Sequence, residues 1–224
     1  MHSHLLPGID DGAPDLAESL TLIRALLDLG FAELYTTPHV MSDLYPNSRD
    51  TILRKRDELL EAVAESGLEV RLDAAAEYYI DTAFTDRLIR EPLLTLPGNR
   101  VLVEQSMMQP YPNLDQVLFD LQMKGYQPVL AHPERYAFYR HAEQILELAD
   151  RGIELQVNLL SLSGYYGTAA RKMAKALIEA GVVSFVGTDL HHIRHAKALA
   201  ECLKEPMFVR AAAQAANPTL STSG

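Results

Sequence analysis

Two histidines stand two residues apart near the start of this 224-residue chain, at His2 and His4. In extended backbone, residues at this spacing project their side chains to the same side, so both imidazoles could bind one metal ion. Such a pair is common by chance and is a weak indication of a metal site when it stands alone. The prediction therefore depends on whether other ligand-type residues join the pair.

Ligand-type residues recur at the ends of several predicted strands. Most follow a short apolar or β-branched run, as His132 follows Pro-Val-Leu-Ala. The set consists of His39, Glu77, Glu104, His132, Asp189 and His191. Imidazoles and carboxylates without thiolates suit zinc, manganese or iron, and this set exceeds the three or four protein ligands of one catalytic ion. We therefore predict more than one divalent ion.

Each of these residues also has a simpler interpretation. A histidine after a strand can donate to a backbone carbonyl, and a loop carboxylate is commonly solvated or caps a helix. Asp10 and Asp11 directly precede Gly12 and the first predicted helix, so one of them is expected to cap that helix. Glu104 is harder to explain in this way, because it follows an apolar strand and its burial requires a cation or hydrogen bonds.

Alternating strands and helices are needed to bring these residues together. Short β-rich runs alternate with helical stretches of roughly 12 to 18 residues, which is typical of parallel strands joined by crossover helices. The predicted strands cover residues 32–37, 68–75, 100–104, 127–131, 154–158 and 182–187. The predicted helices cover residues 15–29, 47–66, 82–90, 113–124, 141–150, 168–180, 193–203 and 211–216.

With residues 2–4 counted as the end of a first strand, the pattern gives about seven strand–helix units. It predicts one α/β domain over residues 1–216, a small barrel related to the (β/α)8 design, with residues 217–224 as a frayed tail. A doubly wound open sheet is the alternative, because periodicity does not separate the two. In a parallel barrel the C-terminal strand ends converge on one face, which would gather the ligand-type residues.

Composition and charge exclude several classes of protein. Apolar residues make up 48% of the chain and charged residues 22%, which excludes a disordered or collagen-like protein. No apolar run approaches the roughly 18 residues that span a bilayer, and no signal-peptide pattern is present, so we predict a cytoplasmic protein without membrane insertion. The net charge of −10 argues against binding to nucleic acid.

The single cysteine, Cys202, cannot form an internal disulfide or a thiolate zinc site, which fits a reducing compartment. It does not suit a cysteine-based phosphatase either, because Phe208 stands where that mechanism needs an arginine six residues later. The sequence also lacks a G-x-S-x-G elbow and a Gly-rich phosphate loop, which excludes serine hydrolases and P-loop nucleotidases.

The motifs around the ligand-type residues resemble those of a known family. They are His2-Ser-His4-Leu-Leu-Pro-Gly-Ile-Asp-Asp11-Gly, Thr37-Pro-His39, Ala76-Glu77-Tyr-Tyr, Val103-Glu104, Ala131-His132-Pro-Glu-Arg135-Tyr and Thr188-Asp189-Leu-His191. From residue 2 to about residue 200 the chain resembles the PHP (polymerase and histidinol phosphatase) superfamily, and within it the bacterial tyrosine-protein phosphatases of capsule and exopolysaccharide synthesis. The resemblance implies a distorted (β/α)7 TIM-like barrel with two to three divalent ions, manganese before iron or zinc.

The resemblance also implies a role for each matching residue. The ligands would divide among three ions as His2, His4, Glu77 and Asp189; Glu77, Glu104 and His132; and Asp11, His39 and His191. Arg135 would bind the phosphate and act in catalysis, and Arg194 lies near the position of a second phosphate-binding arginine. A simpler role for Arg135 is a salt bridge to Glu134 or another carboxylate. Members usually have a few apolar residues before this first histidine, so the first strand is expected to be short or truncated.

Hydrolysis of a phosphomonoester is the implied reaction. Divalent ions would lower the pKa of a bridging water so that hydroxide attacks phosphotyrosine in line, while the two arginines clamp the phosphate oxygens. The implied substrate is a phosphotyrosine protein, the tail of a bacterial tyrosine kinase that controls capsule or exopolysaccharide synthesis. Two alternatives stay open: a small-molecule phosphomonoesterase like histidinol phosphatase or a phosphodiesterase, and a non-catalytic metal-binding scaffold subunit. The run from Gln105 to Pro112 has no assigned role.

Overall fold

Parallel strands and surrounding helices make up the structure, a computed structural model that describes residues 1–217. The strands are β1 (Glu33–Thr36), β2 (His39–Val40), β3 (Arg71–Ala74), β4 (Glu77–Tyr79), β5 (Arg100–Glu104), β6 (Gln127–Ala131), β7 (Glu154–Asn158) and β8 (Val183–Gly187). The helices are α1 (Leu16–Asp28), α2 (Arg49–Glu65), α3 (Thr82–Arg90), α4 (Leu114–Met123), α5 (Glu143–Asp150), α6 (Leu159–Ser163), α7 (Thr168–Ala180), α8 (Ile193–Cys202) and α9 (Pro206–Gln214), with a 3-10 turn η1 (Pro133–Arg135). The chain is an α/β protein, as the sequence predicts.

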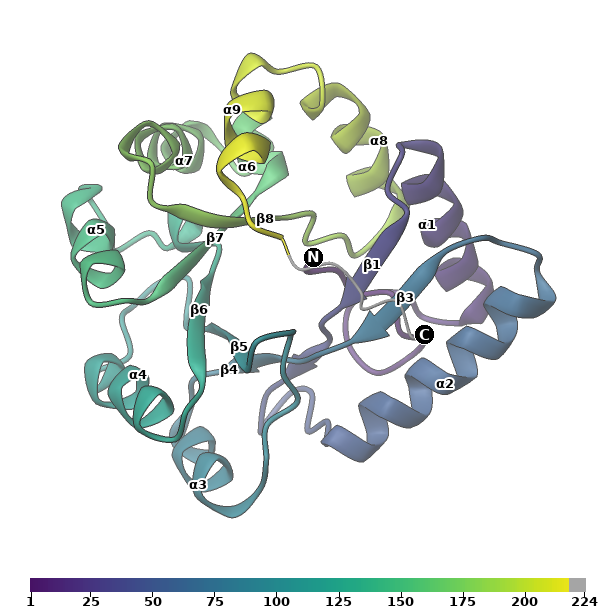
Figure 1. Ribbon diagram of the computed structural model, residues 1–224, viewed down its shortest axis with the longest axis horizontal. Helices are drawn as coiled ribbons and strands as arrows, with labels where there is room; N and C mark the ends of the chain where they lie inside the picture. The colour runs from purple at the N-terminus through teal and green to yellow at the C-terminus, as the bar shows by residue number, and fades with distance from the viewer. Residues whose placement is uncertain (218–224) are drawn as a thin grey trace.

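All pairings between these strands are parallel. β1 pairs with β3, and a larger sheet has the order β2-β4-β5-β6-β7-β8. The helices lie around the outside of the strands (Figure 1). The strand order follows the chain without the reversal that defines a doubly wound sheet. The two sheets are not joined into one closed ladder by the strand pairs.

The N-terminal segment lies between the end of β8 and the end of β1. Ser3 forms a parallel bridge with Leu190, and the His4 N–H donates to the Leu190 carbonyl at 2.9 Å. On the other side, the Thr37 N–H donates to the Ser3 carbonyl at 2.7 Å. These backbone hydrogen bonds hold His2 and His4 in strand-like register, although the expected first strand is reduced to this one bridge.

Two buried clusters alternate along the strands. In β5, Val101 and Val103 belong to the large cluster that includes the helices, whereas Leu102 belongs to a smaller one. The smaller cluster consists of Tyr35, Ala75, Leu96, Leu102, Val129, Ala131 and Phe185. Because successive strand side chains point to opposite faces, both faces of the strands are buried.

The predicted elements differ from the observed ones mainly near the strand ends. β5, β6, β7, α3 and α7 have the predicted bounds. The predicted strands 32–37 and 68–75 are each followed, after a break, by a short second strand, β2 and β4. Pro38 stands in the first break, and it has no N–H for a ladder bond. The turns α6 and η1, which directly follow strands, were not predicted.

The end of the chain differs from the prediction too. The last helix is α9, which begins at Pro206 rather than at the predicted residue 211. Asn217, assigned to the tail, donates from its side chain to the Val186 carbonyl at 2.9 Å and accepts from the Val186 N–H at 3.0 Å. Residues 218–224 of the predicted tail lie outside the described residues.

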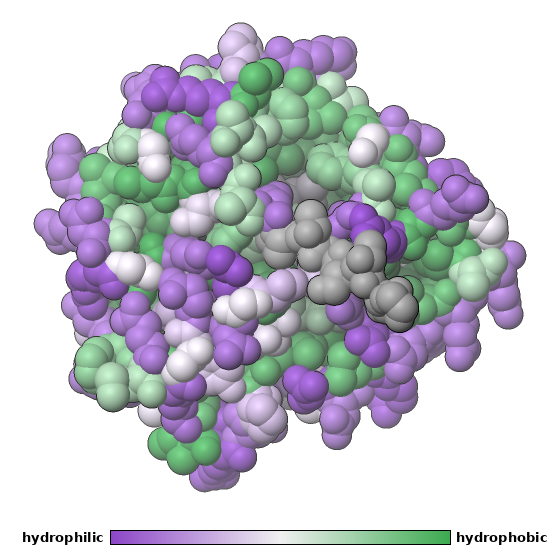
Figure 2. Space-filling view, in the orientation of Figure 1, coloured by the Kyte–Doolittle hydropathy of each residue, from purple (hydrophilic) through white to green (hydrophobic). Residues whose placement is uncertain are grey.

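The outer surface of helix α2 is hydrophilic. Figure 2 shows hydrophilic residues along the edge of the molecule where α2 lies, in agreement with the charged sequence of that helix. Within residues 1–217, no helix combines the length and apolar character that crossing a membrane requires.

We expect the smaller cluster to be important for stability. Phe185 is fully buried and packs under the Arg100 guanidinium, 5.2 Å from the ring centroid. Phe185→Ala should lower the free energy of unfolding by about 3–5 kcal/mol, because it removes a large side chain and leaves a cavity. The measurement is the midpoint of urea unfolding at unchanged m-value. Phe119→Ala is the matched control, because Phe119 is 53% exposed and its loss should cost less than about 1 kcal/mol.

Candidate metal centre

All nine predicted ligands lie together at one end of the strands. Each belongs to at least one of four overlapping groups in which the ligand atoms lie within 4.8 Å of one another. The groups are His4, Asp11, His39 and His191; His2, His4 and Glu77; His2, His132 and Asp189; and His39, Glu77 and Glu104. Residues from the N-terminus to β8 are therefore brought into a single site by the fold.

Four side chains surround one point with nearly equal spacing. The Nε2 atom of His2 lies 3.2 Å from Glu77 Oε2 and 3.3 Å from Asp189 Oδ1. The Nε2 atom of His4 lies 3.5 Å and 3.4 Å from the same two oxygens, and 3.4 Å from His2 Nε2. A tetrahedral ion with bonds of about 2.1 Å would separate its ligands by about 3.4 Å. The residues fit one divalent ion at this point.

Glu77 also extends toward a second group. Its Oε1 lies 3.2 Å from His132 Nε2, which is 3.8 Å from Glu104 Oε2. His39 Nδ1 approaches Glu104 Oε1 at 2.8 Å and Glu77 Oε2 at 3.2 Å. The resemblance placed His39 with the third ion only, whereas the structure places one of its ring nitrogens beside this second group.

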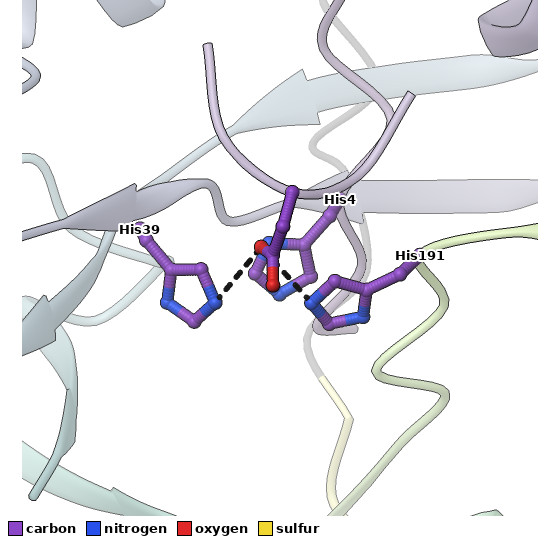
Figure 3. Close-up of side chains that lie close together, drawn as sticks. His4, His39 and His191 are labelled. Atoms are coloured by element: carbon purple, nitrogen blue, oxygen red, sulfur yellow. Dashed lines mark ion pairs between the residues drawn. The ribbon is translucent and has the colours of Figure 1, made fainter. Parts of the chain in front are cut away.

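The third group is centred on Asp11. Its Oδ1 lies 3.4 Å from His39 Nε2 and 3.5 Å from His191 Nε2, the two contacts drawn as dashed lines in Figure 3. Figure 3 also shows His4 facing this group, and its ring stacks on His191 with centroids 3.9 Å apart. Burial alone would raise the pKa of Asp11, but His191 and the other imidazoles lower it to about 2. The carboxylate is therefore ionised and available as a ligand.

Hydrogen bonds on the far side of the imidazoles fix their orientation. His2 Nδ1 lies 2.6 Å from Gln156 Oε1, His4 Nδ1 lies 2.8 Å from Asp10 Oδ2, and His191 Nδ1 lies 2.9 Å from the Asp189 carbonyl. Each partner is an acceptor, so the proton belongs on Nδ1 and the lone pair on Nε2. The Nε2 atoms face the ligand groups, as metal binding requires.

Several buried polar atoms of the site lack a hydrogen bond. His39 Nδ1 and Glu104 Oε1 lie 2.8 Å apart, yet neither has a hydrogen bond of acceptable geometry, and His132 Nδ1 also has no partner. Unpartnered buried polar atoms are costly and rare. A cation that accepts lone pairs from both His39 and Glu104 would resolve this arrangement, so these residues also fit a bound metal.

Backbone strain is concentrated in this site. His2, His132 and Asp189 have positive φ angles of 67°, 33° and 47°. Among the non-glycine residues of 1–217, only Asn99 shares this left-handed conformation. Side chains other than glycine rarely adopt it, and the strain persists where surrounding contacts impose it. His2, His132 and Asp189 all have side chains in the ligand cluster.

Two glycines allow the chain to approach the ligands closely. A Cβ on Gly12 would lie 2.3 Å from the His4 carbonyl oxygen, and a Cβ on Gly187 would lie 2.5 Å from Gln156 Nε2 and 3.0 Å from His2 Cβ. A larger residue at Gly12 would require His4 to move, and one at Gly187 would require Gln156, the partner of His2, to move.

Opposite charges outweigh the effect of burial in the centre of the site. Burial alone would lower the pKa of His2 and His4, but Glu77 and Asp189 raise it for His2, and Asp10 does so for His4. Burial alone would raise the pKa of Glu77 and Asp189, but the surrounding histidines, His2 first, hold both pKa values well below their usual range. The ionised forms of Glu77 and Asp189 and the protonated forms of His2 and His4 therefore stabilise one another when no metal is bound.

Arg135 lies at the wall of the site and pairs with Asp189 rather than with Glu134. Its Nη1 lies 2.5 Å from Asp189 Oδ2, and its guanidinium lies 4.2 Å from the ring centroid of Tyr166. The Glu134 carboxylate instead accepts from the Asn158 N–H at 2.9 Å and from Ser161 Oγ at 2.6 Å.

Arg194 and the run from Gln105 differ from the ligands in their placement. Arg194 is exposed on α8, and no hydrogen bond or ion pair within residues 1–217 joins it to the cluster. Gln105, Ser106 and Met107 line a cavity of about 290 Å³ together with six of the predicted ligands and Arg135. The start of the run from Gln105 to Pro112, which had no predicted role, thus forms part of the wall of the site.

Sequence reasoning missed the residues that support the ligands. Neither Asp10 nor Asp11 caps the first helix, because Asp15 does so by accepting from the Glu18 N–H. Asp10 instead accepts from the backbone N–H groups of Gly12 and His39 as well as from His4. The sequence signal for this role was the position of Asp10, six residues after His4 of the His-x-His motif.

The second missed support is a pair of amides on β7. Gln156 donates to Asn158 Oδ1 at 2.9 Å, and Asn158 donates to Asp189 Oδ2 at 2.7 Å. The signal was available, because the two amides stand two residues apart in a strand, next to the apolar Leu155 and Val157, and must share one face.

Gln156→Leu should weaken metal binding by about tenfold or more, because it removes the acceptor that orients His2. The metal dissociation constant can be measured by competition with a fluorescent chelator. Gln116→Leu is the matched control, because Gln116 is exposed on α4, far from the ligands in sequence, and its side chain donates a hydrogen bond to Asp120 on the same helix. Equal affinities for the wild-type and Gln156→Leu proteins, both folded by circular dichroism, would contradict the supporting role.

This chain is similar to known proteins in sequence. The family model described as "Capsular polysaccharide synthesis, CpsB/CapC" matches residues 1–213. The tyrosine-protein phosphatase YwqE of Bacillus subtilis (strain 168) is 30% identical over 196 residues, which cover 87% of this chain and 77% of YwqE. The putative tyrosine-protein phosphatase CapC of Staphylococcus aureus is 26% identical over 195 residues, which cover 86% of this chain and 76% of CapC.

The fold is similar to a solved one as well. The match is to the crystal structures of YwqE from Bacillus subtilis and CpsB from Streptococcus pneumoniae, described as unique metal-dependent tyrosine phosphatases. The TM-score is 0.82 at 29% sequence identity, and the match covers 92% of this chain and 85% of the other.

Proposed function

Because this chain belongs to the CpsB/CapC family of capsular polysaccharide synthesis, we propose that it is a metal-dependent protein tyrosine phosphatase. The observation that carries the proposal is the cluster of nine imidazole and carboxylate ligands, with several ligand atoms at the spacing of metal-bound groups. Relatives named as tyrosine-protein phosphatases support the reaction class.

We propose that the cluster holds two to three divalent ions, with manganese as the expected metal and iron or zinc as alternatives. The first would bind His2, His4, Glu77 and Asp189; the second Glu77, Glu104 and His132; and the third Asp11, His39 and His191. When bound, such ions lower the pKa of a coordinated water and neutralise the charge on phosphate oxygens. The spread of histidines and carboxylates over three groups supports this number.

Arg135 is proposed to bind the phosphate. A guanidinium has five N–H donors, and the contact with Asp189 uses only the Nη1 side of Arg135, so other N–H groups can donate to phosphate oxygens. Tyr166 supports the guanidinium from one face. Arg194 is proposed as a second phosphate contact, which requires its exposed side chain to extend from the first turn of α8 over the site.

For the fold, we propose a distorted (β/α)7 barrel. β1 and β2 would form one interrupted strand, as would β3 and β4, and residues 2–4 would supply the seventh position. Backbone hydrogen bonds from residues 2–4 to Leu190 on one side and to Thr37 on the other support closure at this position. The alternation of two buried clusters along the strands supports an enclosed interior.

The proposed substrate is phosphotyrosine in a protein, the tail of a bacterial tyrosine kinase that controls capsule or exopolysaccharide synthesis, in the cytoplasm. The matched family model is described by capsular polysaccharide synthesis, which supports this setting.

The metal-loaded protein should contain two to three divalent ions per chain and hydrolyse a phosphotyrosine peptide, and a chelator should abolish this turnover. Glu104→Ala should reduce kcat/KM by about a hundredfold or more, because the second ion loses a ligand. Elemental analysis and a phosphate-release assay measure both. Glu61→Ala, which changes an exposed glutamate on α2, is the control.

The same assay separates the alternative functions. Faster turnover of small phosphomonoesters or of diesters than of phosphopeptides would favour a small-molecule phosphatase or a phosphodiesterase. Bound metal without turnover of any substrate would favour a scaffold subunit.

Cys202→Ser should retain the wild-type kcat and KM. Cys202 is fully buried, its thiol donates to the Leu159 carbonyl at 2.6 Å, and burial raises its pKa to about 11. A thiol with these properties is a poor nucleophile at neutral pH. Steady-state kinetics with a phosphotyrosine peptide test this, and loss of kcat in a folded Cys202→Ser protein would contradict a metal-based mechanism.

A further inference from the structure

A second cavity lies directly beside the metal centre. Its volume is about 660 Å³, and it is formed by η1, the loop that leads to α5, and α7. α5 and α7 are neighbours around the outside of the strands (Figure 1). We call this second cavity the groove. Arg135 lines both the groove and the smaller cavity over the ligands. A molecule whose phosphate contacts Arg135 could therefore continue into the groove.

The groove combines an apolar floor with two unpaired cations. Tyr139, Tyr166 and Met173 contribute aromatic and thioether surface. Arg140 and Lys172 approach from the loop before α5 and from α7, and both residues are exposed. Among residues 1–217, no carboxylate forms an ion pair with either of these side chains, although the whole chain carries a net charge of −10.

Acidic residues in the groove do not cancel these charges. Glu134 lines it, but its carboxylate is buried and accepts from Ser161 and from the Asn158 backbone. Glu143 is exposed at the start of α5, and it leaves an excess of positive charge when Arg140 and Lys172 are counted against it. The groove suits an extended ligand with negative charge.

The shared wall also offers an unused polar atom. The Tyr166 hydroxyl is buried and has no hydrogen-bond partner, while the ring of the same residue supports Arg135. A ligand that lies along the groove could hydrogen-bond to this hydroxyl. Arg135 and Tyr166 thus connect the metal centre to the groove.

We propose that this groove binds an acidic polypeptide segment of the substrate, adjacent in sequence to the phosphotyrosine that enters the metal centre. The inference rests on the proposed phosphatase function and specifies its substrate class. Charge complementarity with Arg140 and Lys172 selects aspartate, glutamate or a second phosphotyrosine next to the reacting residue. Because Arg135 lines both the groove and the cavity over the ligands, the segment in the groove and the reacting phosphotyrosine would belong to one polypeptide.

The test compares two phosphotyrosine peptides, one flanked by glutamates and one by glutamines, with the wild-type protein and with Arg140→Gln/Lys172→Gln. For the acidic peptide, the double substitution should raise KM by roughly three- to tenfold with kcat unchanged, because two exposed ion pairs are lost. The glutamine-flanked peptide and p-nitrophenyl phosphate should be hydrolysed equally by both proteins. Lys175→Gln is the matched control, since Lys175 lies on the same helix but outside the groove.

Fluorescence anisotropy of a labelled acidic peptide that carries a non-hydrolysable phosphonate supplies a readout without turnover. The double substitution should weaken its binding by the same factor. Equal KM values for the two peptides, or equal effects of Lys175→Gln and the double substitution, would overturn the groove assignment. A protein that binds the acidic phosphonate peptide through Arg140 and Lys172 but hydrolyses nothing would overturn the phosphatase function and keep the groove. Equally tight binding of an acidic-tract peptide and of a single-stranded oligonucleotide would show a general polyanion surface and reject the proposal.

Discussion

The burial of several carboxylates at one point is the constraint on which the rest of this structure depends. Glu77, Glu104 and Asp189 are all almost completely buried. An isolated buried charge is very unfavourable unless opposite charges or hydrogen bonds compensate it. The histidines supply that compensation, and they come from segments far apart in the sequence. The parallel strands, the close approach at Gly12 and the left-handed residues at strand ends all serve to bring the two sets of side chains together.

Positive charge can compensate the buried carboxylates both without metal and with metal bound. Without metal, nearby carboxylates raise the pKa of His2, of His4 and of His39, the last to about 9 despite its burial and the nearby His4, so that protons on these imidazoles offset the buried carboxylates. With metal, the ions take over that positive charge, and the protons must leave because imidazole binds a metal through its lone pair. The same side chains therefore stabilise the fold in one state and prepare the reaction site in the other. Metal binding and folding are expected to be coupled for this reason.

The sequence was sufficient to predict the strand–helix alternation and the residues that gather at the strand ends. A short β-rich run such as residues 127–131 is followed at once by a residue of another type, so the end of its strand could be predicted from the sequence. The supports were harder to predict, because Asp10 and Gln156 act only through contacts that exist in the folded chain. Arg194 shows the opposite difficulty: its place in sequence suggests the site, but the helical position that α8 gives it leaves the side chain exposed. Motif position does not determine side-chain direction.

Asp189 contacts both Arg135 and the histidines of the candidate metal centre. Its Oδ1 faces His2 and His4, whereas its Oδ2 accepts from Arg135 and from the Asn158 amide. One carboxylate thus sets the position of the Arg135 guanidinium, which we propose binds the phosphate, relative to the first group of ligands. Tyr166 holds the other face of that guanidinium, and the groove begins beside it. A polypeptide that fills the groove would press on the same arginine that receives its phosphate, so recognition of the chain and placement of the reacting group would depend on one side chain.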